Sequence, residues 1–373
     1  MKFLQPLLLA LSISALACSS QNNGEKTTFV FHINSSVVPL QNPVEYDSVL
    51  SSLNTFFKNQ PPSQSRHSQE YFSSHRNIYR DIHLEDTSYK PSLLHILPTD
   101  VDTQYIMKFA FMKQDVNGFS DLRFIYNMLA RKEGTRFSFH RIFDYNTRDW
   151  VKQHAGTMTY YYHPSNIFNR KLAEQSDSFN IALAKRLEVE PEKITYYKCQ
   201  NAIELFKLKG FDYTRGMYRD TIGGRVEDDI GILSANNSEW YPHEIAHYYP
   251  PKLTDHCRNS IFLEGFATYA GGTHYYSLNE MLRLTKEYLR LHPQTDIVKN
   301  IFEENDVVSH VPYMYVFGGL LCKLAEEKES LNGIKKLLES YFSEMDFYQV
   351  VEEVFGVRKD DFNTFMRQEL EKY

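Results

Sequence analysis

His243, Glu244 and His247 form the pattern His-Glu-x-x-His, whose residue types and spacing suit metal chemistry. Two histidines four positions apart on a helix face the same side, so both imidazoles can reach one metal ion. Glu244 lies one position further round the helix, where its carboxylate can contact a water molecule on the metal without being a ligand. The pattern therefore predicts a metal site with an adjacent general base.

The flanking residues indicate a short helix around this pattern. Pro242 stands directly before His243, where a first-turn proline is tolerated, and Ser238 is a candidate N-cap. Pro250 and Pro251 should end the helix soon after His247. A helix closed at both ends would hold the two imidazoles rigidly.

A catalytic zinc site needs three protein ligands and one open position. Glu264, in the apolar run Leu-Glu-Gly-Phe-Ala at 263–267, is a candidate for the third ligand. Such a run is a poor environment for an unpaired carboxylate. A ligand is therefore favoured over the alternative, an ordinary helix carboxylate.

The two segments together resemble the zinc-binding helices of gluzincin peptidases, such as the thermolysin and aminopeptidase families. Residues 262–269 are similar to the family signature N-E-G-[FHI]-x-[ED]-[YF], although Leu263 replaces the usual Asn and the gap after His247 is slightly short. The resemblance implies one zinc ion per chain, held by His243, His247 and Glu264. It implies that Glu244 is the general base.

Two further expectations come from the same resemblance. Gly265 should let the second zinc helix approach the first one closely. Thr268, one turn after Glu264, is placed to orient the first histidine through its hydroxyl. The alternative for Thr268 is a helix threonine that bonds to its own backbone.

A later segment, residues 311–321, resembles the Y-x-x-[AG]-[GS]-x-[FL] stretch of these peptidases, whose tyrosine donates a hydrogen bond to the developing oxyanion. On that alignment the tyrosine is Tyr315. Tyr313, which follows Val-Pro, and His310 are the other candidates, and with 26 tyrosines in the chain a core tyrosine is a further alternative. The G-x-M-E-N motif of the aminopeptidases is missing, and Gly-Ile-Leu-Ser at 231–234 lies in its place. How a substrate is recognised therefore stays open.

The elements around these motifs predict an α+β fold. We expect strands at 157–162, 194–198 and 230–233, helices at 167–187 and 202–207, and helices joined by short loops from Trp240 onward. This order is typical of a thermolysin/aminopeptidase-like catalytic domain with a mixed sheet and a helical C-terminal subdomain. We assign it to residues 151–373, with the metal in the cleft between its two parts.

The preceding region, residues 44–150, reads as a small α+β module. Helical periodicity covers 46–58, and strand-like runs follow at 93–97, 105–112, 122–129 and 137–143, with a turn at 132–135. In element order this module resembles the cone-shaped nuclear-transport-factor-like domains, whose curled sheet wraps a helix.

The N-terminus predicts export. Lys2 and the apolar residues 3–17 are typical of a signal peptide, assigned to 1–17. The sequence Ala-Leu-Ala-Cys at 15–18 resembles a bacterial lipobox that would place a lipid on Cys18, and an ordinary A-x-A cleavage site is the alternative. Polar residues 18–43 read as a tether. The protein would then be lipid-anchored to a membrane of a bacterial cell envelope.

Net charge and cysteine spacing limit the binding partners and metal sites that we expect. The formal net charge of −6, without a basic cluster, argues against nucleic acid and leaves a peptide or protein substrate as the expected partner. Cys199, Cys257 and Cys322 show no CxxC spacing, which argues against a cysteine-type zinc site. Cys322 reads as a buried thiol, and a Cys199–Cys257 disulfide stays open.

Two functions of different classes fit the sequence. The first is zinc-dependent peptide hydrolysis by a metallopeptidase. The second is a catalytically inactive surface binding or assembly lipoprotein that retains a metallopeptidase-like fold. The presence of both histidines, both glutamates and a candidate tyrosine favours the enzyme, because an inactive descendant would be expected to have lost one of them.

Overall fold

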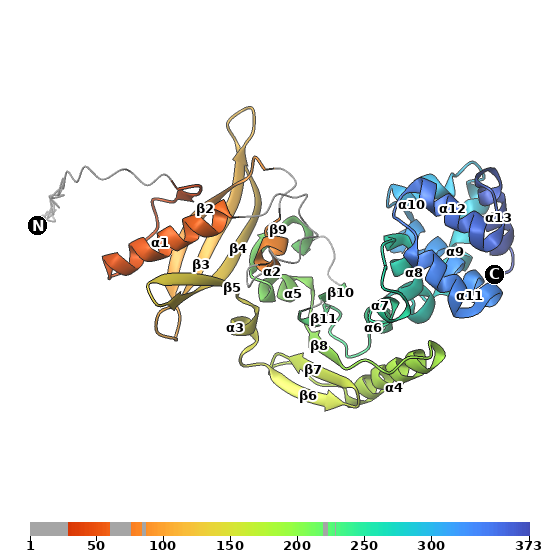
Figure 1. Cartoon of the computed structure of the whole chain (residues 1–373), viewed down its shortest axis with the longest axis horizontal. Helices are drawn as coiled ribbons and strands as arrows, with labels where there is room; N and C mark the ends of the chain where they lie inside the picture. The colour runs from red at the N-terminus through yellow and green to blue at the C-terminus, as the bar shows by residue number, and fades with distance from the viewer. Residues whose placement is uncertain (1–28, 60–75, 84–86, 219–222, 228) are drawn as a thin grey trace, which may run out of the picture.

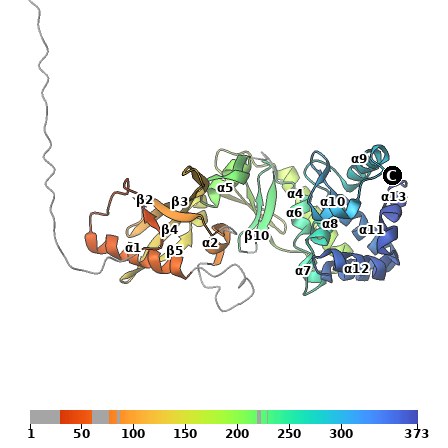
Figure 2. The same cartoon turned by 90° about the horizontal axis from the view of Figure 1, so that it is seen from above.

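The computed structural model describes residues 29–59, 76–83, 87–218, 223–227 and 229–373. Three parts lie in a row: an N-terminal sheet with its helices, a second sheet, and a helical C-terminal part (Figures 1 and 2). The expected signal peptide at 1–17 and Cys18 lie outside the described residues. Within these ranges, no helix combines the length and hydrophobicity that crossing a membrane requires.

The N-terminal sheet is largely antiparallel and has the strand order β1-β2-β3-β4-β5, with β9 also paired to β4. Helix α1 packs against it, and Val49 and Leu53 of α1 are fully buried on an aromatic core. Helix α1 begins after Asn42, whose side chain accepts hydrogen bonds from two backbone N–H groups of the first turn. The elements are β1 (His32–Ile33), α1 (Pro43–Lys58), α2 (Arg76–Asp81), β2 (Lys90–Pro98), β3 (Gln104–Gln114), β4 (Ser120–Glu133), β5 (Arg136–Arg141) and β9 (Phe211–Thr214).

Two strands of this sheet come from outside the range 44–150. Strand β1 lies in the segment expected to be a tether, and it pairs in parallel with β2 while Phe31 is buried in the core. Strand β9 follows residue 150 by a long stretch of chain and pairs antiparallel with β4. The described end of the tether is therefore folded, and the N-terminal sheet is completed by a strand from the expected catalytic domain.

The second sheet is mixed and has the order β10-β11-β8-β7-β6. Strands β7, β8 and β11 are parallel, while β6 and β10 run antiparallel at the two edges. Helix α4 connects the parallel strands β7 and β8, as such a crossover requires. Its elements and those beside it are α3 (Phe143–Thr147), β6 (Val151–Ala155), β7 (Met158–Tyr162), α4 (Arg170–Arg186), β8 (Ile194–Lys198), α5 (Ala202–Leu208), β10 (Gly224–Glu227) and β11 (Gly231–Ser234).

The C-terminal part is helical, as expected, except for a short hairpin, β12–β13, that the sequence reading missed. Its elements are α6 (Pro242–Ala246), α7 (Pro250–Leu253), α8 (Ser260–Gly271), α9 (Leu278–Leu291), α10 (Ile297–Phe302), β12 (Asp306–Val308), β13 (Val311–Pro312), α11 (Tyr313–Glu339), α12 (Glu344–Phe355) and α13 (Phe362–Leu370). The α+β class with a mixed sheet and a helical end is thus confirmed.

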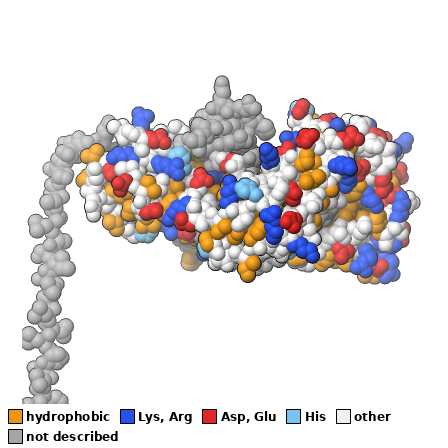
Figure 3. Space-filling view, turned by 90° about the horizontal axis from the view of Figure 1, so that it is seen from below, with side chains coloured by type: hydrophobic (Ala, Val, Ile, Leu, Met, Phe, Trp, Pro, Cys, Tyr) orange, Lys and Arg blue, Asp and Glu red, His pale blue; other side chains and the backbone are white. Residues whose placement is uncertain are grey.

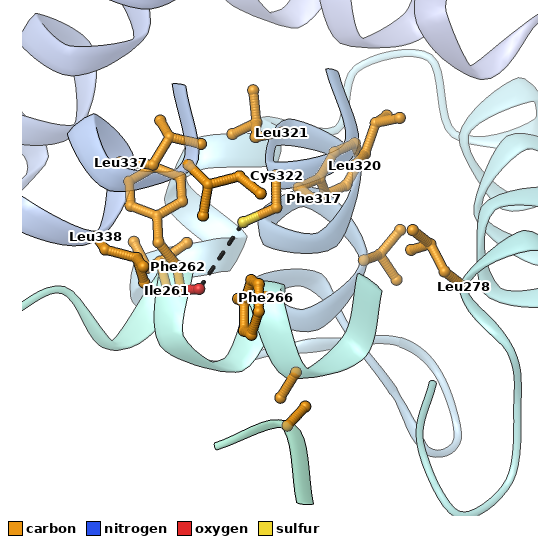
Figure 4. Close-up of a cluster of buried hydrophobic side chains, with 14 of the residues drawn as sticks. Ile261, Phe262, Phe266, Leu278, Phe317, Leu320, Leu321, Cys322, Leu337 and Leu338 are labelled. Atoms are coloured by element: carbon orange, nitrogen blue, oxygen red, sulfur yellow. Dashed lines mark hydrogen bonds between the residues drawn. The ribbon is translucent and has the colours of Figure 1, made fainter. Parts of the chain in front are cut away.

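Helices α8 and α11 form the centre of the C-terminal core. Apolar side chains of α8, such as Phe262 and Phe266, face Phe317 and Leu320 of α11 (Figure 4). Cys322 is fully buried, as predicted, and its thiol donates to the carbonyl oxygen of Phe262 at 3.8 Å. This packing fixes the helix that carries Glu264.

Glycines allow the close approach of these helices, and their partners differ from the sequence expectation. A Cβ atom on Gly265 would lie 2.3 Å from the backbone of Gly318 in α11, so Gly265 serves the α8–α11 contact. The contact between α6 and α8, the helices of the His243 and Glu264 motifs, depends on Gly271 instead. A Cβ there would lie 2.5 Å from the backbone carbon of Pro242 in α6.

On the face shown in Figure 3, Lys and Arg side chains are interspersed with Asp and Glu.

Cys199 and Cys257 are both free thiols, so the disulfide left open by the sequence is not formed in this structure.

Candidate metal centre

Helix α6 carries the two histidines and is only slightly longer than one turn. Pro242 is its first residue, as predicted, and His247 is its C-cap. Ser238 is not the N-cap: that position is Tyr241, which makes no side-chain cap bond, and the hydroxyl of Ser238 accepts from the N–H of Trp240 at 3.0 Å. The prolines at 250 and 251 begin the separate helix α7.

The segment that enters α6 is fixed by a buried ion pair. Lys198 Nζ of β8 lies 2.8 Å from Glu239 Oε1, and both side chains are almost fully buried. The same oxygen accepts from the N–H of Asn169 at 3.0 Å. A buried pair with additional hydrogen bonds defines one geometry, so the chain enters the metal helix from a rigid point on the second sheet.

The structure brings His243, His247 and Glu264 together. The Nε2 atoms of the two histidines lie 3.2 Å apart, and Glu264 Oε2 lies 3.2 Å from the first and 3.5 Å from the second. In the described part of the chain, this is the one group of three or more His, Cys, Asp or Glu side chains that could hold a metal ion. The three residues could therefore hold a metal ion.

The size of this triangle fits a zinc ion. Zinc–nitrogen and zinc–oxygen bonds of about 2.0–2.1 Å at tetrahedral angles place neighbouring ligand atoms about 3.3 Å apart. The three observed separations lie on both sides of that value. Two imidazole nitrogens and one carboxylate are also a ligand set that zinc accepts.

The other nitrogen of His243 fixes the direction of its ring. Its Nδ1 lies 2.7 Å from the carbonyl oxygen of Gly272, which can only accept a hydrogen bond. Nδ1 therefore carries the proton and Nε2 presents its lone pair toward His247 and Glu264. The role of Gly272 could not be predicted from the sequence, because a backbone carbonyl acceptor does not depend on the residue type.

Thr268 does not take the position that the resemblance implied. Its side chain is fully buried, and within the described ranges its hydroxyl has no hydrogen-bond partner, neither His243 nor a backbone carbonyl. The carbonyl of Gly272, at the C-terminal end of the same helix, orients His243 in its place.

Glu244 is buried beside the triangle and is not part of it. Burial raises the pKa of Glu244; the charges of His247 and His243 oppose the rise, and the carboxylate of Glu264 adds to it. For Glu264, burial also opposes ionisation, but the contacts of its carboxylate with the imidazoles of His243 and His247 hold its pKa well below the usual range. The two carboxylates therefore differ in basicity, with Glu244 the better proton acceptor.

Tyr315 lies at the centre and Tyr313 does not. The ring of Tyr315 stacks on His243 with the ring centroids 5.5 Å apart. Burial and a hydrogen bond to Glu264 raise the pKa of Tyr315, so its hydroxyl stays protonated as a donor. Tyr313 is fully buried, stacks on Phe317 and bonds to Tyr288.

His310, the third candidate, lies further out. Its ring stacks on Tyr275 with centroids 4.1 Å apart, in the turn of the β12–β13 hairpin. A cavity of about 520 Å³ separates this hairpin from the metal centre, and both His310 and Tyr315 line it.

The chain was compared with protein-family models, with curated proteins and with solved structures, and none of them matches it. The metal centre is therefore interpreted from its own geometry.

Proposed function

We propose that this protein is a zinc metallopeptidase that hydrolyses peptide bonds. The observation that carries the proposal is the triangle of His243, His247 and Glu264 with Glu244 directly outside it. A site for structural zinc would be closed by a fourth protein ligand. Here three ligands converge, and the next carboxylate has a raised pKa, which suits a general base.

The chain's own residues have distinct duties in this reaction. Zinc, when bound, supplies a Lewis acid and lowers the pKa of water to about 7. Glu244 accepts the proton of the attacking water and passes it to the leaving amine. Tyr315 exchanges its bond to Glu264 for one to the substrate carbonyl oxygen as that oxygen becomes negative, which is typically worth about 3 kcal/mol for a single donor.

The export and anchoring of this peptidase belong to the same proposal. Their support is the signal-like segment 1–17 and Cys18 in the sequence. Full-length wild type expressed in a bacterium should partition into detergent, and Cys18→Ser should partition into water. Equal partitioning of the two proteins would remove the lipid anchor from the proposal.

The enzyme is separated from the binding-protein alternative by Glu244→Gln. This substitution keeps the shape of the side chain and removes its basicity, so bound zinc should remain at one per chain while turnover falls at least about a hundredfold. Zinc content and cleavage of a diverse peptide library measure the two quantities. A wild type that binds zinc and cleaves nothing in the library would establish the binding protein instead.

Tyr315→Phe, compared with Tyr313→Phe, completes this test. Loss of the Tyr315 hydroxyl removes a bond made mainly in the transition state, so kcat should fall by about a hundredfold with KM nearly unchanged. The Tyr313 hydroxyl bonds to Tyr288, away from the cleft, so its removal should change kcat far less. A larger fall in kcat for Tyr313→Phe than for Tyr315→Phe would mean that Tyr313 is the oxyanion donor.

A further inference from the structure

The cavity beside the metal centre has walls with a definite chemical character. It measures about 520 Å³ and lies between the metal centre and the segment that leads from α10 into the β12–β13 hairpin. Tyr241 and Tyr315 form its inner wall, and their rings lie 6.4 and 5.5 Å from the ring of His243. A substrate group in this cavity would therefore adjoin a bond held at the metal.

The outer wall of the cavity is acidic. Glu304 and Asp306 line it, and the residues that line it within the described ranges include no Lys or Arg. Neither carboxylate forms an ion pair with another described residue, whereas the neighbouring Glu303 pairs with Lys299 at 3.8 Å. The two negative charges at the cavity are thus not compensated by the described protein.

Aromatic rings complete the walls. Tyr275 lines the cavity together with Tyr241 and Tyr315. The electron-rich faces of tyrosine rings attract ammonium and guanidinium groups, and more strongly where water is partly excluded. Carboxylates and aromatic rings around one cavity therefore both select a cation.

The hairpin holds the acidic wall in place. Val307, between the strand residues Asp306 and Val308, is buried in the core of the helical part. The N–H of Tyr313 donates to the carbonyl oxygen of Asn305 at 3.0 Å, which ties the start of the hairpin to the start of α11. The backbone next to the two carboxylates is therefore held before a ligand arrives, so that only the two side chains need to be ordered on binding.

The favoured cation is organic. The acidic and histidine side chains around the cavity do not converge as metal ligands, because in the described part of the chain only His243, His247 and Glu264 form such a group. A primary ammonium or a guanidinium, on the other hand, can use separated carboxylates and ring faces at the same time.

We propose that this cavity is a specificity subsite that binds a cationic group of the substrate next to the bond that is cleaved. The group is either a lysine or arginine side chain or the free α-amine of a peptide. This inference rests on the proposed peptidase function and adds the substrate class to it. Glu304 and Asp306 select the cation, and Tyr241 and Tyr275 provide the aromatic wall.

The test uses one peptide series, measured first on wild-type protein and on the Glu244→Gln protein and then on variants of the acidic wall. Each peptide carries a single lysine among uncharged side chains, and the lysine is placed in turn at each position around the cleaved bond. In matched controls, norleucine replaces the lysine. Each peptide is prepared with a free and with an acetylated N-terminus. Wild-type protein reports kcat/KM, and zinc-loaded Glu244→Gln protein reports the affinity for the same labelled peptides.

A preference for lysine over norleucine at one position is expected, about fivefold per carboxylate for charges this exposed. Glu304→Gln/Asp306→Asn should lower kcat/KM for the lysine peptide to the value for the norleucine peptide and retain one zinc. Glu303→Gln is the matched control, since it removes one charge from the same segment outside the cavity, and it should retain the preference. Higher ionic strength should weaken the preference.

The outcomes separate this inference from the proposed function. A preference for free over acetylated N-termini that the double variant abolishes would identify the α-amine as the cation. Cleavage without any preference for a cation would overturn the subsite and leave the peptidase standing. Failure of wild type to cleave, with a carboxylate-dependent preference for lysine in binding, would overturn the peptidase and leave the cation site standing.

Discussion

Two clusters of buried ionisable side chains lie at the two ends of strand β10, and they differ in how their charges are compensated. At one end, Glu227 joins a network that links the N-terminal sheet to the second sheet. At the other end, a Cβ on Gly224 would lie 3.1 Å from the side chain of Glu244, next to the metal centre. The short strand β10 thus runs from the contact between the N-terminal sheet and the second sheet to the candidate active site.

The network at Glu227 satisfies its own charges. Arg141 makes two 2.7 Å bonds to Asp81 and lies 2.9 Å from Glu227. Lys209 lies 2.6 Å from Glu227 and 3.1 Å from Asp81. All four side chains are at least nine-tenths buried, and each of the two acids contacts both Arg141 and Lys209. Such a network is complete without a ligand, and it fixes how the two sheets meet.

The candidate metal centre differs from this network in how its carboxylates are compensated. Within the described ranges, no Lys or Arg forms an ion pair with Glu244 or Glu264, and two imidazole nitrogens point at the same space. Buried carboxylates without compensation are unfavourable. Burial of charge alone therefore does not indicate a ligand site, whereas buried carboxylates without a paired Lys or Arg do, and a metal ion would supply the positive charge.

The largest expected effect follows from removing one of the three side chains proposed to bind the metal ion. His243→Ala, His247→Ala and Glu264→Ala should each abolish stoichiometric zinc, because a site with two protein ligands loses most of its affinity. Zinc per chain after dialysis against a chelator-buffered solution measures this. Full zinc in Glu264→Ala would mean that the third ligand is misassigned.

The next largest effect concerns the compensated cluster. Arg141→Met leaves Asp81 and Glu227 buried with one fewer cation, and breaking a buried pair in this way costs about 3–5 kcal/mol of unfolding free energy. Arg225→Met is the control, since Arg225 also contacts Glu227, at 3.2 Å, but is half exposed, and its loss should cost less than about 1 kcal/mol. Urea unfolding measures both, and equal losses would contradict the comparison.

Acid should weaken the same cluster in a defined pH range. Burial alone would raise the pKa of Glu227, but Lys209 and Arg141 lower it to about 2. A lowered pKa stabilises the folded state above the unfolded-state pKa of about 4.3, and this contribution is lost as pH falls toward 2. Its size is roughly 3 kcal/mol. The difference in unfolding free energy between wild type and Glu227→Gln should therefore shrink between pH 5 and pH 2, and a constant difference would rule out the assignment.

How far the sequence could predict these two regions depends on the range of the interactions. The two histidines follow from helical spacing, and Glu264 follows from its apolar surroundings and the resemblance to a gluzincin signature, so the candidate ligands His243, His247 and Glu264 could be found without a structure. The Arg141–Asp81–Glu227 network could not, because its members lie far apart in the chain and each looks like an ordinary surface charge. Strand β9 was missed for the same reason: its pairing with β4 is a tertiary contact of a four-residue segment.

The smallest expected effect distinguishes the two ways of orienting His243. Thr268→Val removes a buried hydroxyl that has no partner in the described structure, so stability should rise by no more than about 1 kcal/mol. Thr285→Val is the matched control, because Thr285 is equally buried, has an equally unpartnered hydroxyl and lies on α9.

Since the carbonyl of Gly272 already holds Nδ1 of His243, zinc affinity should be the same in wild type, Thr268→Val and Thr285→Val within about twofold. Competition with a zinc-sensitive dye measures it. Groups that orient a ligand histidine typically contribute about 10–100-fold in metal affinity. A loss of that size in Thr268→Val, but not in Thr285→Val, would return the orienting role to the Thr268 hydroxyl and would mean that it turns toward His243 when the metal binds.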